Sequence, residues 1–100
     1  MAAYFVVHNR VTDAEAMYER YIPKAVETIM AYGGEVLVVD EDSTIIEGGT
    51  DLPRTIIVKF DSREQAEAWY RCAEYQAVAP IRLGASEGYA VIVDGFEMSG

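Results

Sequence analysis

The sequence predicts one α+β domain in which helices cover a single face of a four-stranded sheet. Its 100 residues fall well below the roughly 250 at which chains begin to divide, so residues 1–100 form one domain. Strand-like and helix-like segments follow one another in the order β-α-β-β-α-β, which is the ferredoxin-like arrangement. These elements leave the second sheet face bare, and pairing with another copy as a dimeric α/β barrel would cover it.

Residues 3–11 (AYFVVHNRV) predict the first strand, because aromatic and β-branched side chains are concentrated there. Alternation divides the strand into a more apolar face, expected to meet the helices, and a more polar face, expected to border a wetter space. The apolar face holds Phe5, Val7, Asn9 and Val11, and the polar face holds Tyr4, Val6, His8 and Arg10.

The first helix is expected to begin at a capping box formed by Thr12 and Glu15 and to end at Gly33 and Gly34. Apolar residues at helical spacing predict its buried face. They are Ala14, Met17, Tyr18, Tyr21, Ile22, Ala25, Ile29 and Met30. Pro23 lacks a backbone donor, so a kink is expected there.

The rest of the chain alternates between strands, loops and a second helical region. Strands are predicted over residues 35–40, 54–60 and 89–93, with a turn over 41–43, a brief extension over 44–47 and a loop over 48–53. Ser62 and Gln65 form a second capping box, which opens a helix with Ala66, Trp69 and Tyr70 on its inner face. A short helical continuation is expected from Glu74 to about Arg82, unless Pro80 ends it earlier. A turn between residues 84 and 88 should precede the last strand.

Charge and composition exclude several classes of partner. Eight basic residues against 17 acidic ones give a net charge of −9, which repels nucleic acid and anionic membranes. The longest apolar run, Ala2–Val7, is far shorter than the roughly 20 residues of a membrane span. Cys72 is the single cysteine, so no disulfide can form within the chain and a cytoplasmic location is expected.

Several segments resemble domain-of-unknown-function family 1330 (DUF1330). They are AYFVVHNRVTDAEAMYERY at the start, AYGG at 31–34, EG at 47–48, PR at 53–54 and VKFDSREQAEAWYRCAEYQAVAPIR at 58–82. The resemblance implies a dimeric α/β barrel related to the antibiotic-biosynthesis monooxygenases, and it implies no assigned activity. Haem-degrading relatives combine Asn, Trp and an axial His. Asn9 and Trp69 echo the first two, and the resemblance makes Asn9 a candidate substrate-binding residue. No histidine follows His8, which disfavours haem degradation.

The candidate site residues are few, and each has a structural alternative. His8 could serve as a general base or be a hydrogen-bonded structural residue. Trp69 and Tyr75 could stack an aromatic ligand, as Trp and Tyr do in related cofactor-free monooxygenases, or belong to the core. Arg54 and Arg82 could bind an anion or pair with acids, and Glu47 could be such a partner or an acid at the cavity mouth.

Two functional hypotheses remain open at this point. One is a non-catalytic small-molecule-binding or structural homodimer. The other is a cofactor-independent, monooxygenase- or isomerase-like enzyme for an aromatic or enolic substrate, with His8 as base, an arginine for the anion, and Trp69 with Tyr75 as stacking wall. The second better explains the polar face of the first strand. No cofactor or metal is expected, since a lone histidine is a poor basis for a metal site.

Overall fold

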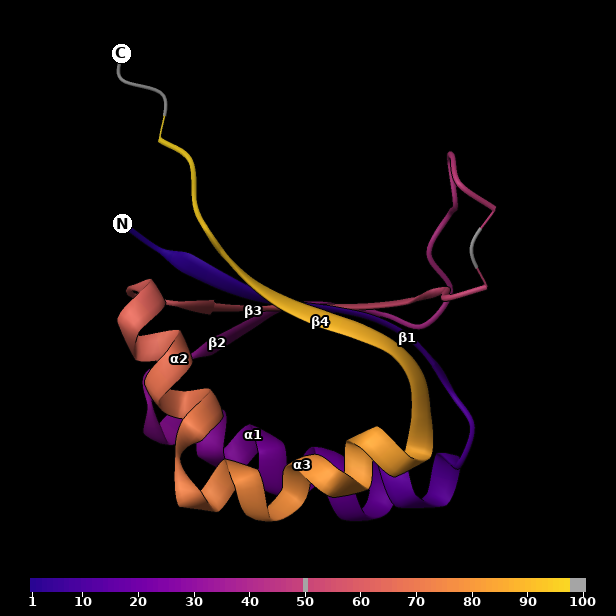
Figure 1. Cartoon of the computed structure of the whole chain (residues 1–100), viewed down its shortest axis with the longest axis horizontal. Helices are drawn as coiled ribbons and strands as arrows, with labels where there is room; N and C mark the ends of the chain where they lie inside the picture. Colours follow the sequence, from indigo (N-terminus) through magenta and orange to yellow (C-terminus); the bar gives the residue numbers. More distant parts are fainter. Residues whose placement is uncertain (50, 98–100) are drawn as a thin grey trace.

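The computed structural model describes residues 1–49 and 51–97, which form a layer of helices under a four-stranded sheet (Figure 1). The elements follow the order β1 (Ala3–Val11), the π-helical segment η1 (Ala16–Tyr21), α1 (Ile22–Ala31), β2 (Glu35–Asp40), β3 (Arg54–Phe60), α2 (Arg63–Arg71), α3 (Ala73–Ala85) and β4 (Ser86–Asp94). The predicted order of elements is confirmed, and the first three strands have the predicted bounds.

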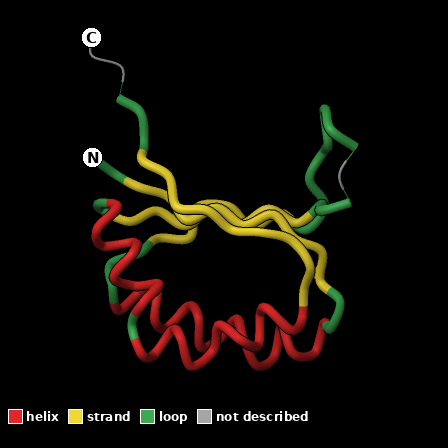
Figure 2. Tube along the Cα trace, in the orientation of Figure 1, coloured by secondary structure: helices red, strands yellow, loops and turns green. Residues whose placement is uncertain are grey.

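The sheet has the order β2-β3-β1-β4, and each neighbouring pair is antiparallel. The helices of the described residues lie on one face, and the loop segments 41–49 and 51–53 rise from the opposite side (Figure 2). We call the first the covered face and the second the open face. This arrangement is a ferredoxin-like α+β fold, with β1 in a central position between β3 and β4.

Strand β1 shows the two-residue alternation that its sequence predicts. Phe5 and Val7 are buried on the covered face, and Asn9 follows them on the same face. His8 lies on the open face, opposite Thr55 of β3 and Tyr89 of β4. Because directly paired residues share a face, the register of β1 assigns the side chains of its two neighbours as well.

An aromatic cluster fills the core between the sheet and α2. The ring of Trp69 lies 4.9 Å from that of Phe5, 5.3 Å from that of Phe60 and 4.2 Å from that of Tyr75. Trp69 is completely buried, and its indole nitrogen donates to the hydroxyl of Thr28, 3.0 Å away. The contacts of this cluster tie α1, α2 and α3 to the centre of the sheet.

The start of the first helix differs from the prediction. Asp13, not Thr12, caps it, with the Asp13 carboxylate accepting from the amide of Ala16 at 3.2 Å. The backbone amide of Thr12 instead donates to the carbonyl of Ala85 at 2.8 Å, which ties the end of β1 to the end of α3. That bond keeps Thr12 outside the helix, so the predicted capping box with Glu15 does not form.

Pro23 follows a widened helical turn, in agreement with the expected disturbance of the hydrogen-bond ladder. The six residues of η1 are π-helical, and Pro23 lies in the first turn of α1, where a missing donor costs little. The wider turn alters the helical period, so Tyr18 and Met30 of the predicted buried stripe are exposed. Met17, Tyr21, Ala25 and Ile29 are buried as predicted.

The second helical region is longer than predicted. Ser62 caps α2 as expected, and Cys72 separates it from α3, accepting from the amide of Tyr75 at 3.4 Å. Helix α3 continues through Pro80 to Ala85, since burial on both sides of the proline outweighs one lost hydrogen bond. The predicted turn before the last strand is wrong, because β4 begins immediately after α3.

Gly88 therefore lies within β4, where it pairs with Asn9. Its φ of +146° is open to glycine but strained for other residues, and a Cβ at this position would collide with the carbonyl oxygen of His8. The glycine thus permits close approach of β4 to β1 at the end of the sheet where Asn9 lies.

Candidate functional site

The predicted site residues do not share one cavity. Trp69, Tyr75, Arg54, Arg82 and Asn9 are all buried on the covered side. His8 and Glu47 line a hollow on the open face. The sheet lies between the two groups, so the prediction that His8 approaches Trp69, Tyr75 or one of these arginines is wrong. The reason is the alternation of β1, which turns His8 away from every helix.

The covered face contains a small cavity of about 120 Å³ between the sheet and α1. Its walls are mainly apolar, and its polar lining comes from Tyr21, Arg54 and Arg82. The apolar lining residues are Phe5, Val7, Ile22, Ala25, Val26, Ile29, Val36, Val39, Ile56 and Val58. An apolar space with a few convergent polar groups is the usual form of a small-molecule site.

Arg54 enters this cavity from the first residue of β3 and is held by two partners. Its Nε donates to the two carboxylate oxygens of Glu41 at 3.1 and 3.3 Å, and its Nη1 donates to the amide oxygen of Asn9 at 3.3 Å. The ring of Tyr18 lies 5.8 Å from the guanidinium carbon. In a chain with so many acidic residues an ion pair between Arg54 and a carboxylate is expected, and Glu41 forms it.

Arg82 enters the same cavity from α3, and it has no such partner. Its side chain is as deeply buried as that of Arg54, and its Nε donates to the hydroxyl of Tyr75 at 3.3 Å. Among the residues that the structure describes, no carboxylate forms an ion pair with Arg82. Burial lowers the pKa of Arg82 and the neighbouring Tyr75 and Tyr21 raise it, with a net rise, and an arginine remains charged at neutral pH in any case.

Two tyrosines far apart in the sequence complete the polar part of the covered site. The hydroxyls of Tyr21 and Tyr75 lie 2.7 Å apart in a buried hydrogen bond. Burial, reinforced by Tyr75, raises the pKa of Tyr21 well above that of an ordinary phenol. Tyr21 is therefore a neutral hydroxyl at physiological pH, able to donate or accept a hydrogen bond, and it is not a base.

Trp69 and Tyr75 do not line the cavity. Tyr75 contacts it only through its hydrogen bonds to Arg82 and Tyr21, and Trp69 is enclosed by other aromatic rings. The structure therefore supports the core interpretation of both rings, and it offers no stacking wall between them.

On the open face, His8 lies at the end of a short chain of hydroxyl groups. Its Nδ1 is 3.2 Å from the hydroxyl of Thr55, which is 2.7 Å from the hydroxyl of Ser43. The ring of Tyr89 lies 5.6 Å from the imidazole, and Glu47 lines the same hollow of about 470 Å³. These residues are open to solvent, and none of them is a buried charged group that lacks a partner.

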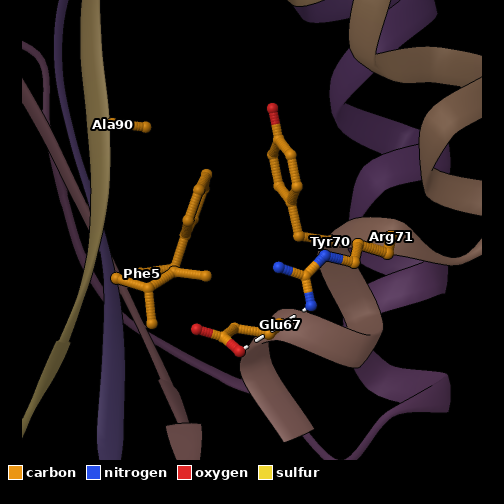
Figure 3. A pocket seen from close by; sticks show the side chains of 6 residues that line it. Phe5, Glu67, Tyr70, Arg71 and Ala90 are labelled. Atoms are coloured by element: carbon orange, nitrogen blue, oxygen red, sulfur yellow. Dashed lines mark ion pairs between the residues drawn. The ribbon is translucent and has the colours of Figure 1, made fainter. Parts of the chain in front are cut away.

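A third hollow, of about 390 Å³, lies between α2 and the strands β1 and β4 (Figure 3). Phe5 points from the sheet toward Tyr70 on α2, and Glu67 and Arg71 lie beside them on the same helix. These two charges pair with each other at 3.8 Å. The hollow therefore offers no free charge to a ligand.

Sequence reasoning missed Tyr21 and Glu41 as members of the covered site. Tyr21 was identified only as part of the buried helical stripe, and Glu41 was placed in a turn. A signal for Tyr21 existed, because a buried tyrosine needs a partner for its hydroxyl. No group of three or more potential metal ligands occurs among residues 1–49 and 51–97, and no helix in that part of the chain is long and apolar enough to cross a membrane.

The fold and the family now follow from comparison with known proteins. The chain has the ferredoxin-like α+β fold and belongs to the family described as Domain of unknown function (DUF1330), whose model matches residues 2–96. No curated protein matches the chain.

Two solved structures share its fold at low sequence identity. RPA0582, a protein of unknown function from Rhodopseudomonas palustris, has a TM-score of 0.79 at 15% identity, covering 97% of this chain and 84% of that protein. HapK from Hahella chejuensis has a TM-score of 0.63 at 12% identity, covering 98% of this chain and 96% of that one. These similarities concern the fold alone.

Proposed function

We propose that this protein binds a small anionic molecule, with a carboxylate or enolate group, in the cavity on the covered face. The observation that carries the proposal is Arg82, a buried cation at the wall of an apolar cavity, with no carboxylate partner among the described residues. Burying an unpaired charge is costly, so such a charge is usually compensated by a bound or neighbouring anion.

The contrast with Arg54 strengthens this argument. The chain carries 17 acidic residues, and one of them, Glu41, pairs with Arg54. An excess of acids makes an internal partner easy to supply, yet Arg82 interacts with a phenol instead. A ligand anion would restore the balance of charge at Arg82, while the apolar lining would hold its body.

Binding without catalysis fits this site better than the enzymatic hypothesis. The proposed base, His8, lies on the opposite face of the sheet, and the high pKa of Tyr21, caused first by its burial, removes it as a base at neutral pH. The cavity therefore offers a cation, a hydroxyl and apolar walls, which recognise an anion but abstract no proton from it.

The test compares an anion with its neutral counterpart. Pentanoate and benzoate should shift the NMR signals of residues that line the cavity, such as Val7 and Ile29, and pentanamide and benzamide should do so at least tenfold more weakly. Arg82→Met should abolish the carboxylate effect, and Arg20→Met, which removes an exposed arginine, should leave it unchanged. Equal binding of acids and amides, or binding that survives Arg82→Met, would refute the proposal.

We further propose that two copies pair through their open faces. One apolar row, Val38, Ile57, Val6 and Val91, crosses all four strands in direct register. In the single chain Val91 remains 43% exposed, and Tyr89 and Val93 beside it on β4 are exposed as well. A second copy, rather than a different protein, supplies a surface of matching shape and equal apolar character.

Light scattering tests the pairing. The protein should have a mass of about 22 kDa, twice that of the 11.1 kDa chain. Val91→Glu should convert it to a folded monomer, while Leu83→Glu, an equally drastic change on the exposed side of α3, should leave the dimer intact. A wild-type monomer at micromolar concentration would refute the pairing. With no disulfide possible inside the chain, the cytoplasm remains the proposed location.

A further inference from the structure

The buried hydrogen-bond chain formed by Arg82, Tyr75 and Tyr21 holds one more hydrogen than it can use internally. An arginine can only donate, so the Nε of Arg82 donates to the hydroxyl oxygen of Tyr75 at 3.3 Å. The 2.7 Å contact between the hydroxyls of Tyr75 and Tyr21 uses one of their two hydrogens. The other hydroxyl hydrogen has no acceptor among the residues that the structure describes. Because buried polar groups are nearly always hydrogen-bonded, this hydrogen indicates an acceptor from outside the described chain.

The free hydrogen is assigned to Tyr21 by its position. Tyr75 is completely buried and does not line the cavity, whereas Tyr21 is 7% exposed and lines it. Tyr75 therefore donates to Tyr21, and Tyr21 donates into the cavity. This order is also favoured electrostatically, because the bond from the charged Arg82 polarises the hydroxyl of Tyr75, which in turn polarises that of Tyr21 and makes it a stronger donor.

Tyr21 keeps this hydrogen, and the cavity that it lines is accessible to a small molecule. Burial raises the pKa of Tyr21, so the hydroxyl stays protonated at neutral pH. The cavity opens to solvent beside β2, where its lining residues Val36 and Val39 are 41% and 60% exposed. A ligand can therefore enter the cavity beside β2 and approach the polar groups that line it.

We infer that Tyr21 is a specificity-determining residue and that the ligand is a compact carboxylic acid without an ammonium group. This inference rests on the proposed function and adds a second recognition point to it, since the carboxylate accepts a charged hydrogen bond from Arg82 and a neutral one from Tyr21. The three polar side chains that line the cavity, Tyr21, Arg54 and Arg82, are all donors. The ammonium group of an α-amino acid would find no acceptor among them and would be repelled by two guanidinium groups.

The size of the cavity restricts the apolar body of the ligand. About 120 Å³ is close to the volume that accommodates a single benzene-sized group. The acid therefore has a short aliphatic chain or one ring.

Calorimetric titration with pentanoate tests the role of Tyr21 through a matched pair of variants. Tyr21→Phe removes the donor and should weaken binding about tenfold, the effect of one hydrogen bond to a charged acceptor. Tyr75→Phe breaks the same bond between the two tyrosines but leaves Tyr21 its hydrogen, so it should weaken binding by less than about threefold. Tyr32→Phe removes a hydroxyl from the end of α1, outside the cavity, and should leave the affinity unchanged.

Two further measurements use the wild-type protein alone, so they do not depend on the folding of a variant. The hydroxyl proton signal of Tyr21 should move downfield in the NMR spectrum when pentanoate is added, because the hydroxyl then donates to a carboxylate. The amino acid 2-aminopentanoate, with the same five-carbon skeleton, should bind at least tenfold more weakly than pentanoate.

The outcomes separate this inference from the proposed function. Unchanged affinity in Tyr21→Phe, or equal losses in Tyr21→Phe and Tyr75→Phe, would overturn the role of Tyr21 while leaving anion binding intact. An unmoved hydroxyl signal at saturating pentanoate would overturn it as well. Equal binding of 2-aminopentanoate would overturn the ligand class. Failure of every acid to bind the wild type would instead overturn the proposed function.

Discussion

Each face of the sheet carries side chains that its surroundings make unexpected: polar ones on the covered face and apolar ones on the open face. The covered face, sealed by helices, contains two buried arginines and a buried asparagine. The open face displays an apolar row, including Val91, to solvent. Buried charges and exposed apolar patches are the informative exceptions in a folded protein, because each indicates a missing partner. Under the two proposals, a small anion would pair with Arg82 on the covered face, and the sheet of a second copy would cover the open face.

The largest difference in stability between variants of the two faces is expected when a core side chain is truncated. Trp69→Ala deletes a fully buried ring in contact with Phe5, Phe60 and Tyr75, and should lower the free energy of unfolding by about 3–5 kcal/mol. Urea denaturation followed by far-UV circular dichroism measures this loss. Ile46→Ala, in the exposed loop on the open side, should change stability by less than about 0.5 kcal/mol.

A small loss at Trp69 would mean that the ring is not part of the core. It would then be available for a ligand, and the stacking role suggested by the family resemblance would regain support.

A second comparison lies within the covered face, between the paired and the unpaired arginine. Arg82→Met replaces a buried cation that has no carboxylate partner among the described residues by an apolar side chain and should raise ligand-free stability by about 1 kcal/mol. Arg54→Met should lower it by about 1–2 kcal/mol, since Glu41 and the oxygen of Asn9 lose their partner. Urea midpoints measure both. Equal losses in the two variants would show that Arg82 contributes to folding and is not reserved for a ligand.

Alkaline pH provides a third comparison. Burial raises the pKa of Tyr21 in the folded protein, and an unfolded phenol titrates near 10. The folded state therefore holds a proton that the unfolded state loses above pH 10. The stability conferred by this group is fully present below that pH and declines as pH rises.

Tyr21→Phe should lose less stability than the wild-type protein between pH 10 and pH 11, by up to about 1.4 kcal/mol. The measurement is the urea midpoint of the wild type and of Tyr21→Phe at the two pH values. Identical pH dependence in wild type and Tyr21→Phe would contradict the raised pKa.

The sequence was sufficient for the fold because each strand carries its own periodicity. The segment 3–11 divides cleanly into two faces, and the structure buries the face that the pattern selects. Boundaries were less predictable where tertiary contacts override local signals. The amide of Thr12 bonds to Ala85, more than seventy residues away, and burial around Pro80 extends a helix that its local sequence would end.

The sequence identified several residues of the candidate site, but it did not show which of them lie together. Arg54, Arg82 and Asn9 were all selected, and all three lie on the covered face. Grouping His8 with Trp69 was avoidable, because the same alternation that placed Asn9 toward the helices turned His8 away from them. The choice of Glu41 as partner of Arg54, among 17 acids, and the pairing of Tyr21 with Tyr75 depend on contacts that periodicity does not encode.

His8 gives the smallest expected effect and separates the two faces most directly. His8→Ala removes one hydrogen bond to Thr55, whose hydroxyl keeps its contact with Ser43, so stability should change by about 0.5 kcal/mol. The affinity for pentanoate should stay within about twofold of the wild-type value, because the sheet separates His8 from Arg82. Calorimetry and urea denaturation measure the two quantities on the same sample.

A strong loss of acid binding in His8→Ala, with stability unchanged, would couple the open face to the cavity and return His8 to the functional site. Unchanged binding would confine ligand recognition to the covered face, where Arg82 lies.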